Sequence, residues 1–310
     1  MEQSYSATRA AARVALVTCA ELPELDPDDQ SLVPALAAAG ITAVPAVWDD
    51  PAVDWSAFDL AVVRNTWDYP KRRSEFTAWA GSVPQLANAA DVIAWNTDKR
   101  YLRQLADAGI PIVPTTWIEP GDPVHLDTGD TAAAEIVVKP AVSVGSVDTG
   151  RYRLPEQAGL ATAHIERLQA AGRLVMVQPY LADVDTAGET ALLFIAGRYS
   201  HAIRKGAILT GPDEGVETLY QEETITPRTP SPAEHALAER VLAALPFDRA
   251  SLLYARVDLL PAASGDPVVI EVELTEPSLF LTTAADAPDR LAAAIADRLP
   301  APRAEHPGSA

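Results

Sequence analysis

The chain has 310 residues, and its 48% hydrophobic and 22% charged content provides for one large domain or two to three smaller ones packed together. A formal net charge of −19 disfavours non-specific binding to nucleic acid or to an anionic membrane. The single cysteine, Cys19, excludes an internal disulfide and a cysteine-based zinc cluster, and the sequence has no apolar run of the roughly 18 residues that a membrane span needs.

The two ends of the chain are predicted to lack regular structure. Residues 1–12 and 301–310 are expected to be disordered tails, and the start has no pattern typical of a secretory signal. We therefore expect a cytoplasmic protein in which Cys19 is a reduced thiol, buried near the first strand.

Residues 13–95 predict a small parallel α/β domain that binds substrate. Apolar strands are expected at Val14–Cys19, 42–48 and 58–67, and the helix that follows the first strand is expected to end at Gly40. A strand–helix–strand order favours a parallel sheet. Such sheets bind ligands beyond the carboxyl ends of their strands.

Two segments, 18–29 and 64–70, follow strands at that location. In the second, Arg64 comes directly from an apolar strand, and Asp68 and Tyr69 follow closely. One interpretation is a clamp for a zwitterionic substrate, with the guanidinium on its carboxylate and the Asp on its ammonium. The other is a capped turn beside a packed tryptophan.

Residues 96–180 and 181–300 predict two further domains of the α+β type. A helix capped by Asn96 or Thr97 is expected to run through Ala108 and to end at Gly109. The remaining elements are predicted in this order: a strand at 134–139, a helix at 155–172, a strand at 173–181, two antiparallel strands within 188–209 that turn at Ala196–Gly197, a helix at 231–246 with a Ser231–Glu234 capping box, paired strands at 252–261 and 267–274, and a last helix at 288–299.

The paired strands near the end of the chain carry charges at alternate positions. Arg256 and Asp258 share one face of the first strand, and Glu271 and Glu273 share one face of the second. If the strands pair across the turn at 262–266, three carboxylates and a guanidinium converge. Oxygen ligands of this kind suit Mg²⁺. A solvated hairpin face, or an edge strand that uses charges to block pairing, is the alternative.

Two other segments place basic or small residues where an anion could bind. Lys139 ends an apolar strand, and the loop after it contains Ser143, Gly145 and Ser146, so its N–H groups could close round an anion. An ordinary turn between strands is the alternative.

Arg204 and Lys205 form the second basic segment. They are adjacent on a predicted strand, so they face opposite ways, and His201 shares the parity of Lys205. A basic pair on the surface is the alternative to a role in a site.

Taken in order along residues 90–285, these features resemble the ATP-grasp superfamily of ATP-dependent carboxylate ligases. The segments "ARVDLL" and "PVVIEVELTEPSLF" are similar to its closing motif, Arg-x-Asp on one strand and Glu-x-Asn on the next. The resemblance implies that Asp258 and Glu271 bridge magnesium ions and that Arg256 neutralises the transferred phosphoryl group. Glu273 stands where the family usually has Asn, which implies a further negative ligand for a second Mg²⁺.

The resemblance also implies the fold, a parallel α/β N-terminal domain followed by two α+β subdomains that clasp ATP. Lys99 and Lys139 match the lysines that bind the phosphates, but the loop after Lys139 lacks the basic residue often found in the family's lid. The residues assigned in this way to ATP are Lys99, Lys139, Ser143, Val144, Gly145, Ser146, Gln178, Tyr180, Leu181 and Asp185, with Glu189 as the alternative contact to the ribose.

The implied reaction forms ADP. ATP with two Mg²⁺ phosphorylates a substrate carboxylate, and a nitrogen nucleophile then displaces phosphate from the acyl phosphate. The implied metal ligands are Asp258, Glu271 and Glu273. Arg256, together with Arg204 or Lys205, would be catalytic. The residues expected to contact the amino-acid-like substrate are Arg64, Asp68, Tyr69, His201 and Ser278.

The segments "RNTWDYP", "SHAIRK" and "EVELTEPSLF" resemble more closely a subgroup that includes the O-ureido-serine cyclo-ligase of cycloserine biosynthesis. This favours intramolecular ring closure in antibiotic biosynthesis. Two alternatives stay open: a bimolecular ligase of the glutathione-synthetase or D-Ala-D-Ala-ligase type, and a nucleotide-binding regulatory protein without turnover. We expect no nucleic-acid or membrane partner, and a homodimer is the default oligomeric state.

Overall fold

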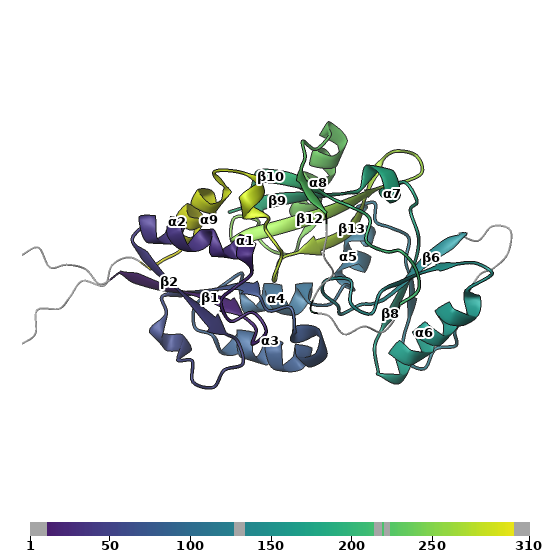
Figure 1. The fold of residues 1–310 in the computed structure, drawn as a ribbon, viewed down its shortest axis with the longest axis horizontal. Coiled ribbons are helices and arrows are strands. Elements are labelled where there is room, and N and C mark those ends of the chain that lie inside the picture. Colours follow the sequence, from purple (N-terminus) through teal and green to yellow (C-terminus); the bar gives the residue numbers. More distant parts are fainter. Residues whose placement is uncertain (1–10, 127–133, 214–218, 220–223, 301–310) are drawn as a thin grey trace, which may run out of the picture.

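The computed structural model of the chain describes residues 11–126, 134–213, 219 and 224–300, and these residues form three sheets (Figure 1). In Figure 1 the N-terminal sheet lies at one end of the molecule, the central sheet at the other, and the large sheet between and above them. The predicted combination of a parallel sheet with antiparallel α+β parts is confirmed.

The N-terminal sheet is parallel. Its strands, in spatial order, are β2 (Ile41–Val47), β1 (Ala12–Thr18), β3 (Leu60–Asn65) and β4 (Leu86–Ala87). The predicted N-terminal tail is therefore one position too long, because Ala12 already pairs with Ile41, while residues 1–10 and 301–310 of the predicted tails lie outside the described residues.

Helices cover both faces of this sheet because the side chains of β1 alternate between them. Val14 and Leu16 pack in one cluster with α2 (Leu32–Ala38) and with α9 (Ala287–Ala296), the last helix of the chain. Ala15 and Val17 pack on the other face with α3 (Arg73–Ser82). The end of the chain thus returns to the N-terminal unit, and α9 lies beside α2 in Figure 1.

The central sheet is antiparallel and holds the loop predicted to bind phosphate. Its strands, in spatial order, are β5 (Thr116–Ile118), β8 (Val175–Pro179), β6 (Glu135–Pro140) and β7 (Gly150–Arg153). Helix α6 (Ala158–Ala170) covers one face through Ala161, Ile165 and Leu168. Residues 141–149, which connect β6 to β7, are called the lid loop below.

The large sheet carries the paired acidic strands. Its strands, in spatial order, are β11 (Ile225–Pro227), β10 (Arg198–Lys205), β9 (Glu189–Ile195), β12 (Tyr254–Pro261) and β13 (Pro267–Glu273). The predicted turn at Ala196–Gly197 is confirmed, and both residues have positive φ, which a tight hairpin turn requires. Helix α8 (Pro232–Ala244) packs on this sheet, and it begins with the predicted Ser231–Glu234 capping box.

The helix predicted from a cap at Asn96 or Thr97 through Ala108 is shorter in the structure, and a helix that was not predicted precedes it. Helix α4 (Ala90–Asn96) ends where the prediction begins, and α5 (Tyr101–Asp107) starts after a turn, with Gly109 at φ +77° beyond its end. Asn96 caps neither helix, because its side-chain amide bonds the backbone at the end of β13, donating to Val272 O and accepting from Leu274 N. The Asn96 side chain, which the sequence suggested as a helix cap, therefore makes a tertiary contact instead.

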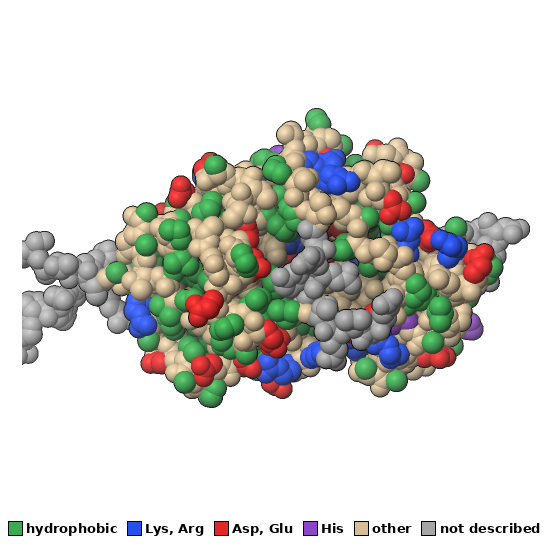
Figure 2. Space-filling model, viewed as in Figure 1, with side chains coloured by type: hydrophobic (Ala, Val, Ile, Leu, Met, Phe, Trp, Pro, Cys, Tyr) green, Lys and Arg blue, Asp and Glu red, His purple; other side chains and the backbone are tan. Residues whose placement is uncertain are grey.

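The remaining short helices are α1 (Pro27–Gln30) and α7 (Val184–Ala187). Cys19 is fully buried after β1, as expected, and burial together with nearby Asp68 and Glu21 raises its pKa to about 11. None of the helices in the described part of the chain combines the length and apolar composition needed to cross a bilayer. On the face drawn in Figure 2, Lys and Arg side chains are interspersed with acidic ones.

Candidate active site

The two acidic strands pair as predicted, and their charges meet on one face. In the antiparallel register of β12 and β13, Arg256 lies opposite Glu273 and Asp258 lies opposite Glu271. The period of two on each strand then brings all four side chains to the same side of the sheet. The edge-strand alternative is only half correct, because β13 is an edge strand but its acids line a cavity.

Basic side chains from three separate segments neutralise these carboxylates. Arg256 Nε donates to Asp258 Oδ1 at 2.9 Å, and the same guanidinium pairs with Glu273. Lys205 Nζ lies 2.7 Å from Asp258 Oδ2, and Lys99 Nζ lies 3.0 Å from an oxygen of Glu271. The hairpin face is therefore a buried network of alternating charges rather than a solvated surface.

The pKa values follow from burial and from these pairings. Burial alone would raise the pKa of Asp258, but Arg256 and Lys205 hold it well below its usual range. Burial raises the pKa of Glu273 to about 7 against the pull of Arg256, and repulsion from Glu271 adds to the rise. Glu276 lies deeper, and burial beside Glu273 raises its pKa to about 8. Such excess negative charge in a low dielectric favours the binding of a cation.

The side-chain oxygens at this site are of the chemical type that binds Mg²⁺. Asp258, Glu271 and Glu273 offer the hard carboxylate oxygens that this ion prefers. Among the described residues, no three acidic, His or Cys side chains lie close enough together to hold a metal. Arg256 and two lysines pair with the carboxylates of this site instead. These three acids could therefore ligate Mg²⁺ once their protein cations move to another anion.

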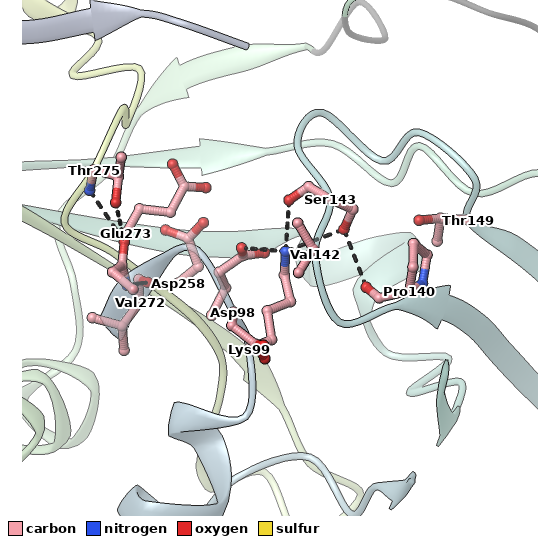
Figure 3. A network of polar contacts seen from close by, with 12 residues as sticks. Asp98, Lys99, Pro140, Val142, Ser143, Thr149, Asp258, Val272, Glu273 and Thr275 are labelled. Atoms are coloured by element: carbon pink, nitrogen blue, oxygen red, sulfur yellow. Dashed lines mark hydrogen bonds and ion pairs between the residues drawn. The ribbon is translucent and has the colours of Figure 1, made fainter. Parts of the chain in front are cut away.

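A cavity lies between the central sheet and the large sheet, where the sequence predicted a nucleotide to bind. Lys99, Lys139 and the lid loop line it together with Glu271 and Glu273, and its other walls are largely apolar. Lys99 Nζ bonds Ser143 O at 2.8 Å, and Figure 3 shows this lysine between the lid loop and the acids of β12 and β13. Burial lowers the pKa of Lys139 to about 8, although the charge of Glu271 opposes the shift. We call this the nucleotide cavity.

The segment predicted to contact the base also lines the nucleotide cavity. Gln178, Tyr180 and Leu181 are all wall residues, whereas Asp185 is not. The carboxylate of Asp185 faces outward, where it accepts from the Tyr180 hydroxyl at 2.5 Å and pairs with Arg151. Glu189, the alternative for the ribose, lines the cavity instead.

A second cavity shares the lid and the acidic wall with the first, and we call it the acidic cavity. Lys205, Arg256, Asp258 and Ser278 line it, as the sequence predicted for residues near the reacting groups. Its far end is formed by residues that the sequence analysis did not single out: Asp26, Asp28, Trp67 and Phe280. The signal for Asp26 and Asp28 was present, because the acidic segment 18–29 was already placed beyond the carboxyl end of the first strand.

Several residues predicted to contact substrate do not reach either cavity. Arg64 is 0% exposed, and Asp29 and the carbonyl of Pro277 hold its guanidinium. His201 is buried against the carbonyl of Leu279. Neither side chain lines either cavity, so the structure does not place them where the sequence predicted a contact with substrate.

Three other predicted residues are also displaced from the site. Arg204 points away from Lys205, as strand parity requires, and donates to Thr186 O and Ala187 O. Asp68 bonds Trp48 and Arg72 and lines a neighbouring hollow. Tyr69 is buried against Phe76, and its hydroxyl bonds Glu276, so it acts on the cavity wall from behind.

Comparisons of the chain with a family model, with a related sequence and with a solved structure agree with one another. The family model for the N-terminal domain of D-cycloserine synthetase DcsG matches residues 14–89. The chain is 41% identical to the cycloserine biosynthesis protein DcsG of Streptomyces lavendulae over 300 residues, which is 92% of this chain and 98% of the relative. The crystal structure of D-cycloserine synthetase DcsG matches with a TM-score of 0.82 and 37% identity, over 93% of this chain and 100% of that one.

A more distant structure defines the wider class. D-alanine–D-alanine ligase from Bacillus anthracis, complexed with ATP, matches with a TM-score of 0.62 and 15% identity, over 93% of this chain and 97% of that one, which supports the fold alone. The fold and the charged cavities together define an ATP-grasp carbon–nitrogen ligase, a class that binds ATP, generally with Mg²⁺. Within that class, the chain belongs to the D-cycloserine synthetase family.

Proposed function

We propose that this ligase closes a ring within one amino-acid-like molecule. The name D-cycloserine synthetase, given to its relatives, supports this proposal because cycloserine is a ring. The substrate carboxylate attacks the γ-phosphorus of ATP, the bond from phosphorus to the bridging oxygen breaks, and ADP leaves. A nitrogen of the same molecule then attacks the acyl phosphate carbon, releasing phosphate and a proton. The observation that carries this proposal is the convergence of three lysines, Arg256 and the three carboxylates of β12 and β13 on two joined cavities.

The lysines bind the phosphate end of ATP in this proposal. Lys99 and Lys139 line the nucleotide cavity beside Ser143, Gly145 and Ser146, whose N–H groups are available to a close anion. Binding of ATP would give the Lys99 ammonium a phosphate partner in exchange for Glu271. The released carboxylate is then a magnesium ligand, so nucleotide and metal binding support each other.

Asp258, Glu271 and Glu273 would hold the metal, and we propose two ions because these three carboxylates line the acidic cavity together. When bound, Mg²⁺ neutralises and orients the β- and γ-phosphate oxygens. Arg256 and Lys205 line the acidic cavity and would stabilise the oxygens of the transferred phosphoryl group and of the tetrahedral adduct. The chain supplies mainly position and charge.

The far end of the acidic cavity supports an amino-acid-like substrate. Asp26 is half-buried, and burial with the adjacent acids Asp28 and Asp29 raises its pKa. A substrate ammonium at this position would relieve that repulsion. Ser278 lines the same cavity and is suited to the substrate carboxylate through its hydroxyl or N–H.

The three parts of the chain would then have separate tasks. We propose that residues 13–95 bind the organic substrate, that 96–180 supply the lid and the base pocket, and that 181–300 supply the metal site. The lid loop would exclude water, which otherwise hydrolyses the acyl phosphate.

The test is ADP release from purified protein with ATP, Mg²⁺ and one organic substrate at a time. O-ureido-serine and other D-serine derivatives are compared with unmodified amino acids, with and without an added amine, and products are identified by mass spectrometry. We expect ADP and a cyclic product from a single substrate. Turnover that depends on the added amine would indicate a bimolecular ligase, and nucleotide binding without turnover by any of these substrates would indicate a regulatory protein.

A further inference from the structure

The segment that follows β13 is fastened by side chains along its whole length. Residues 274–282, called the substrate loop here, contain Glu276 and Ser278 of the acidic cavity. Each of six consecutive carbonyls of this loop accepts a side-chain hydrogen bond. In chain order these are Leu274 from Asn88 Nδ2 (2.7 Å), Thr275 from the Tyr254 hydroxyl (2.9 Å), Glu276 from Trp67 Nε1 (3.2 Å), Pro277 from Arg64 Nη2 (2.7 Å), Ser278 from Arg256 Nη1 (3.1 Å) and Leu279 from His201 Nε2 (2.9 Å).

Arg64 holds the central carbonyl of this series from the N-terminal unit. Asp29 fixes its guanidinium through two contacts, Nε to Oδ1 at 2.8 Å and Nη2 to Oδ2 at 3.3 Å. The Arg64 side chain is fully buried, and its guanidinium also donates to Val63 O at 3.3 Å and lies over the ring of Tyr254. A planar guanidinium with five donors can serve a carboxylate and a carbonyl at once.

The same ion pair also reaches the opposite wall of the acidic cavity. Asn65 Nδ2 donates to Asp29 Oδ2 at 2.8 Å, and Asn65 Oδ1 accepts from the backbone N–H of Asp26 at 2.9 Å. Asp26 and the substrate loop are therefore both tied to Asp29, one through Asn65 and the other through Arg64. Two walls that would face one substrate thus share a single buried anchor.

We propose that Arg64, oriented by Asp29, is a positioning residue that sets the substrate loop against the catalytic arginine. Arg64 binds the carbonyl of Pro277, and the next carbonyl along the chain, that of Ser278, is bound by Arg256. Arg256 in turn binds Asp258. A shift of Pro277 would therefore move Ser278 and change the geometry of Arg256, although Arg64 touches neither ATP nor substrate. This role rests on the proposed function, because the position of the loop would set the rate of that reaction.

The test compares Arg64→Lys, Asp29→Asn and Tyr254→Phe with wild type. Lysine retains the charge but cannot bind Asp29 through two donors and still reach Pro277 O. We expect kcat to fall about 10- to 100-fold in Arg64→Lys, since small misplacements of reacting groups cost rates of this order. The Kd for ATP, measured by calorimetry, should stay within about 2-fold. Tyr254→Phe loses only the hydroxyl between Val63 O and Thr275 O, and a fall of about 3- to 10-fold is expected.

Hydrogen–deuterium exchange of residues 274–282 provides a readout that needs no turnover. We expect faster exchange of this loop in all three variants, with the strands of the large sheet unchanged. Arg249→Lys is the control, because Arg249 also binds a carboxylate, that of Glu239, and a carbonyl, that of Gly197, but it lines neither cavity. It should change neither kcat nor the exchange of the loop.

The outcomes separate this proposal from the proposed function. Wild-type protein that turns over no substrate would remove the proposed function, while the exchange data would still decide whether Arg64 positions the loop. A folded Arg64→Lys variant with wild-type kcat and wild-type exchange would overturn the positioning role. If Arg64→Lys does not fold, Tyr254→Phe decides: wild-type kcat and exchange in that variant would also overturn it.

Discussion

The lid loop and the substrate loop face the same pair of cavities, but they are held in different ways. The lid loop is tied by charged side chains: Lys99 bonds Ser143 near its start, and Asp148 near its end pairs with Arg167 and Arg173. The carbonyls of the substrate loop are instead bonded by buried donors, and four of the six donors are neutral side chains. These donors come from the N-terminal unit, from β10 and from β12.

This difference matters because the two kinds of contact respond differently to ATP. The Lys99 ammonium can exchange Ser143 and Glu271 for a phosphate, so nucleotide binding competes with the present lid contacts. Of the six donors to the substrate loop, only Arg256 is assigned to a phosphoryl oxygen, and the other five have no such alternative partner. We infer that ATP rearranges the lid side of the site and leaves the substrate side in place.

The largest effect is expected where both cavities meet. Asp258→Asn should lower ADP release about 100- to 1000-fold, because it removes a metal ligand and the partner of Arg256 and Lys205. Steady-state assays at saturating Mg²⁺ measure this. Asp266→Asn, in the exposed turn of the same hairpin, is the matched control and should retain wild-type activity. Normal turnover by Asp258→Asn would remove this residue from the metal site.

Two neighbours on β10 provide the next comparison. Lys205→Met should reduce kcat about 10- to 100-fold, since it leaves Asp258 and Glu189 without their shared cation in the acidic cavity. Arg204→Met should keep kcat within about 2-fold of wild type, because its guanidinium bonds only Thr186 O and Ala187 O among the contacts assigned to it. Equal losses of kcat in both variants would contradict the assignment of Lys205 to the cavity side of β10 and of Arg204 to its opposite side.

ATP affinity should depend on pH through Lys139. Burial lowers the pKa of its ammonium to about 8, and a bound phosphate would raise it, so binding takes up a proton at alkaline pH. The Kd for ATP should therefore rise about 10-fold between about pH 7 and pH 9, as calorimetry in matched buffers would show. Lys139→Met should bind ATP more weakly and lose this dependence. The same pH profile in that variant would assign the titration to another group.

The smallest effect is expected at the outer end of the lid loop. Asp148→Asn weakens pairs with Arg167 and Arg173, which are only partly buried, so it should raise the Michaelis constant for ATP about 2- to 5-fold. The fraction of ADP formed without product should also rise, because water enters more often. Glu239→Gln breaks a comparable pair with Arg249 far from the lid and should change neither quantity. Unchanged coupling in Asp148→Asn would show that this end of the loop does not retain the intermediate.

Local periodicity predicted correctly that the four charged side chains of the hairpin converge, because strand parity and one short turn determine it. The register of Arg256 with Glu273 and of Asp258 with Glu271 required no distant information. Lys139 was indicated by its place at the end of an apolar strand, before a loop of small residues. Lys99 came only from the family resemblance, because no local pattern distinguishes it from a lysine on the surface.

The errors concern side chains whose partners lie far away in sequence. Arg64 was predicted to contact substrate, but Asp29 and Pro277, 35 and 213 positions away, bury it. Asn96 was predicted to cap a helix, but it bonds residues more than a hundred positions later. In each case a tertiary hydrogen bond decides the role, and the sequence pattern around the residue carries no trace of it.

The most direct test of the central claim follows the oxygen of the substrate carboxylate. The substrate is labelled with oxygen-18 in that group, turned over with ATP, and the released phosphate is analysed by mass spectrometry. We predict that each phosphate carries one labelled oxygen, because the carboxylate attacks phosphorus and loses that oxygen when nitrogen attacks carbon. Unlabelled phosphate, or label found in AMP, would contradict activation through an acyl phosphate in this site.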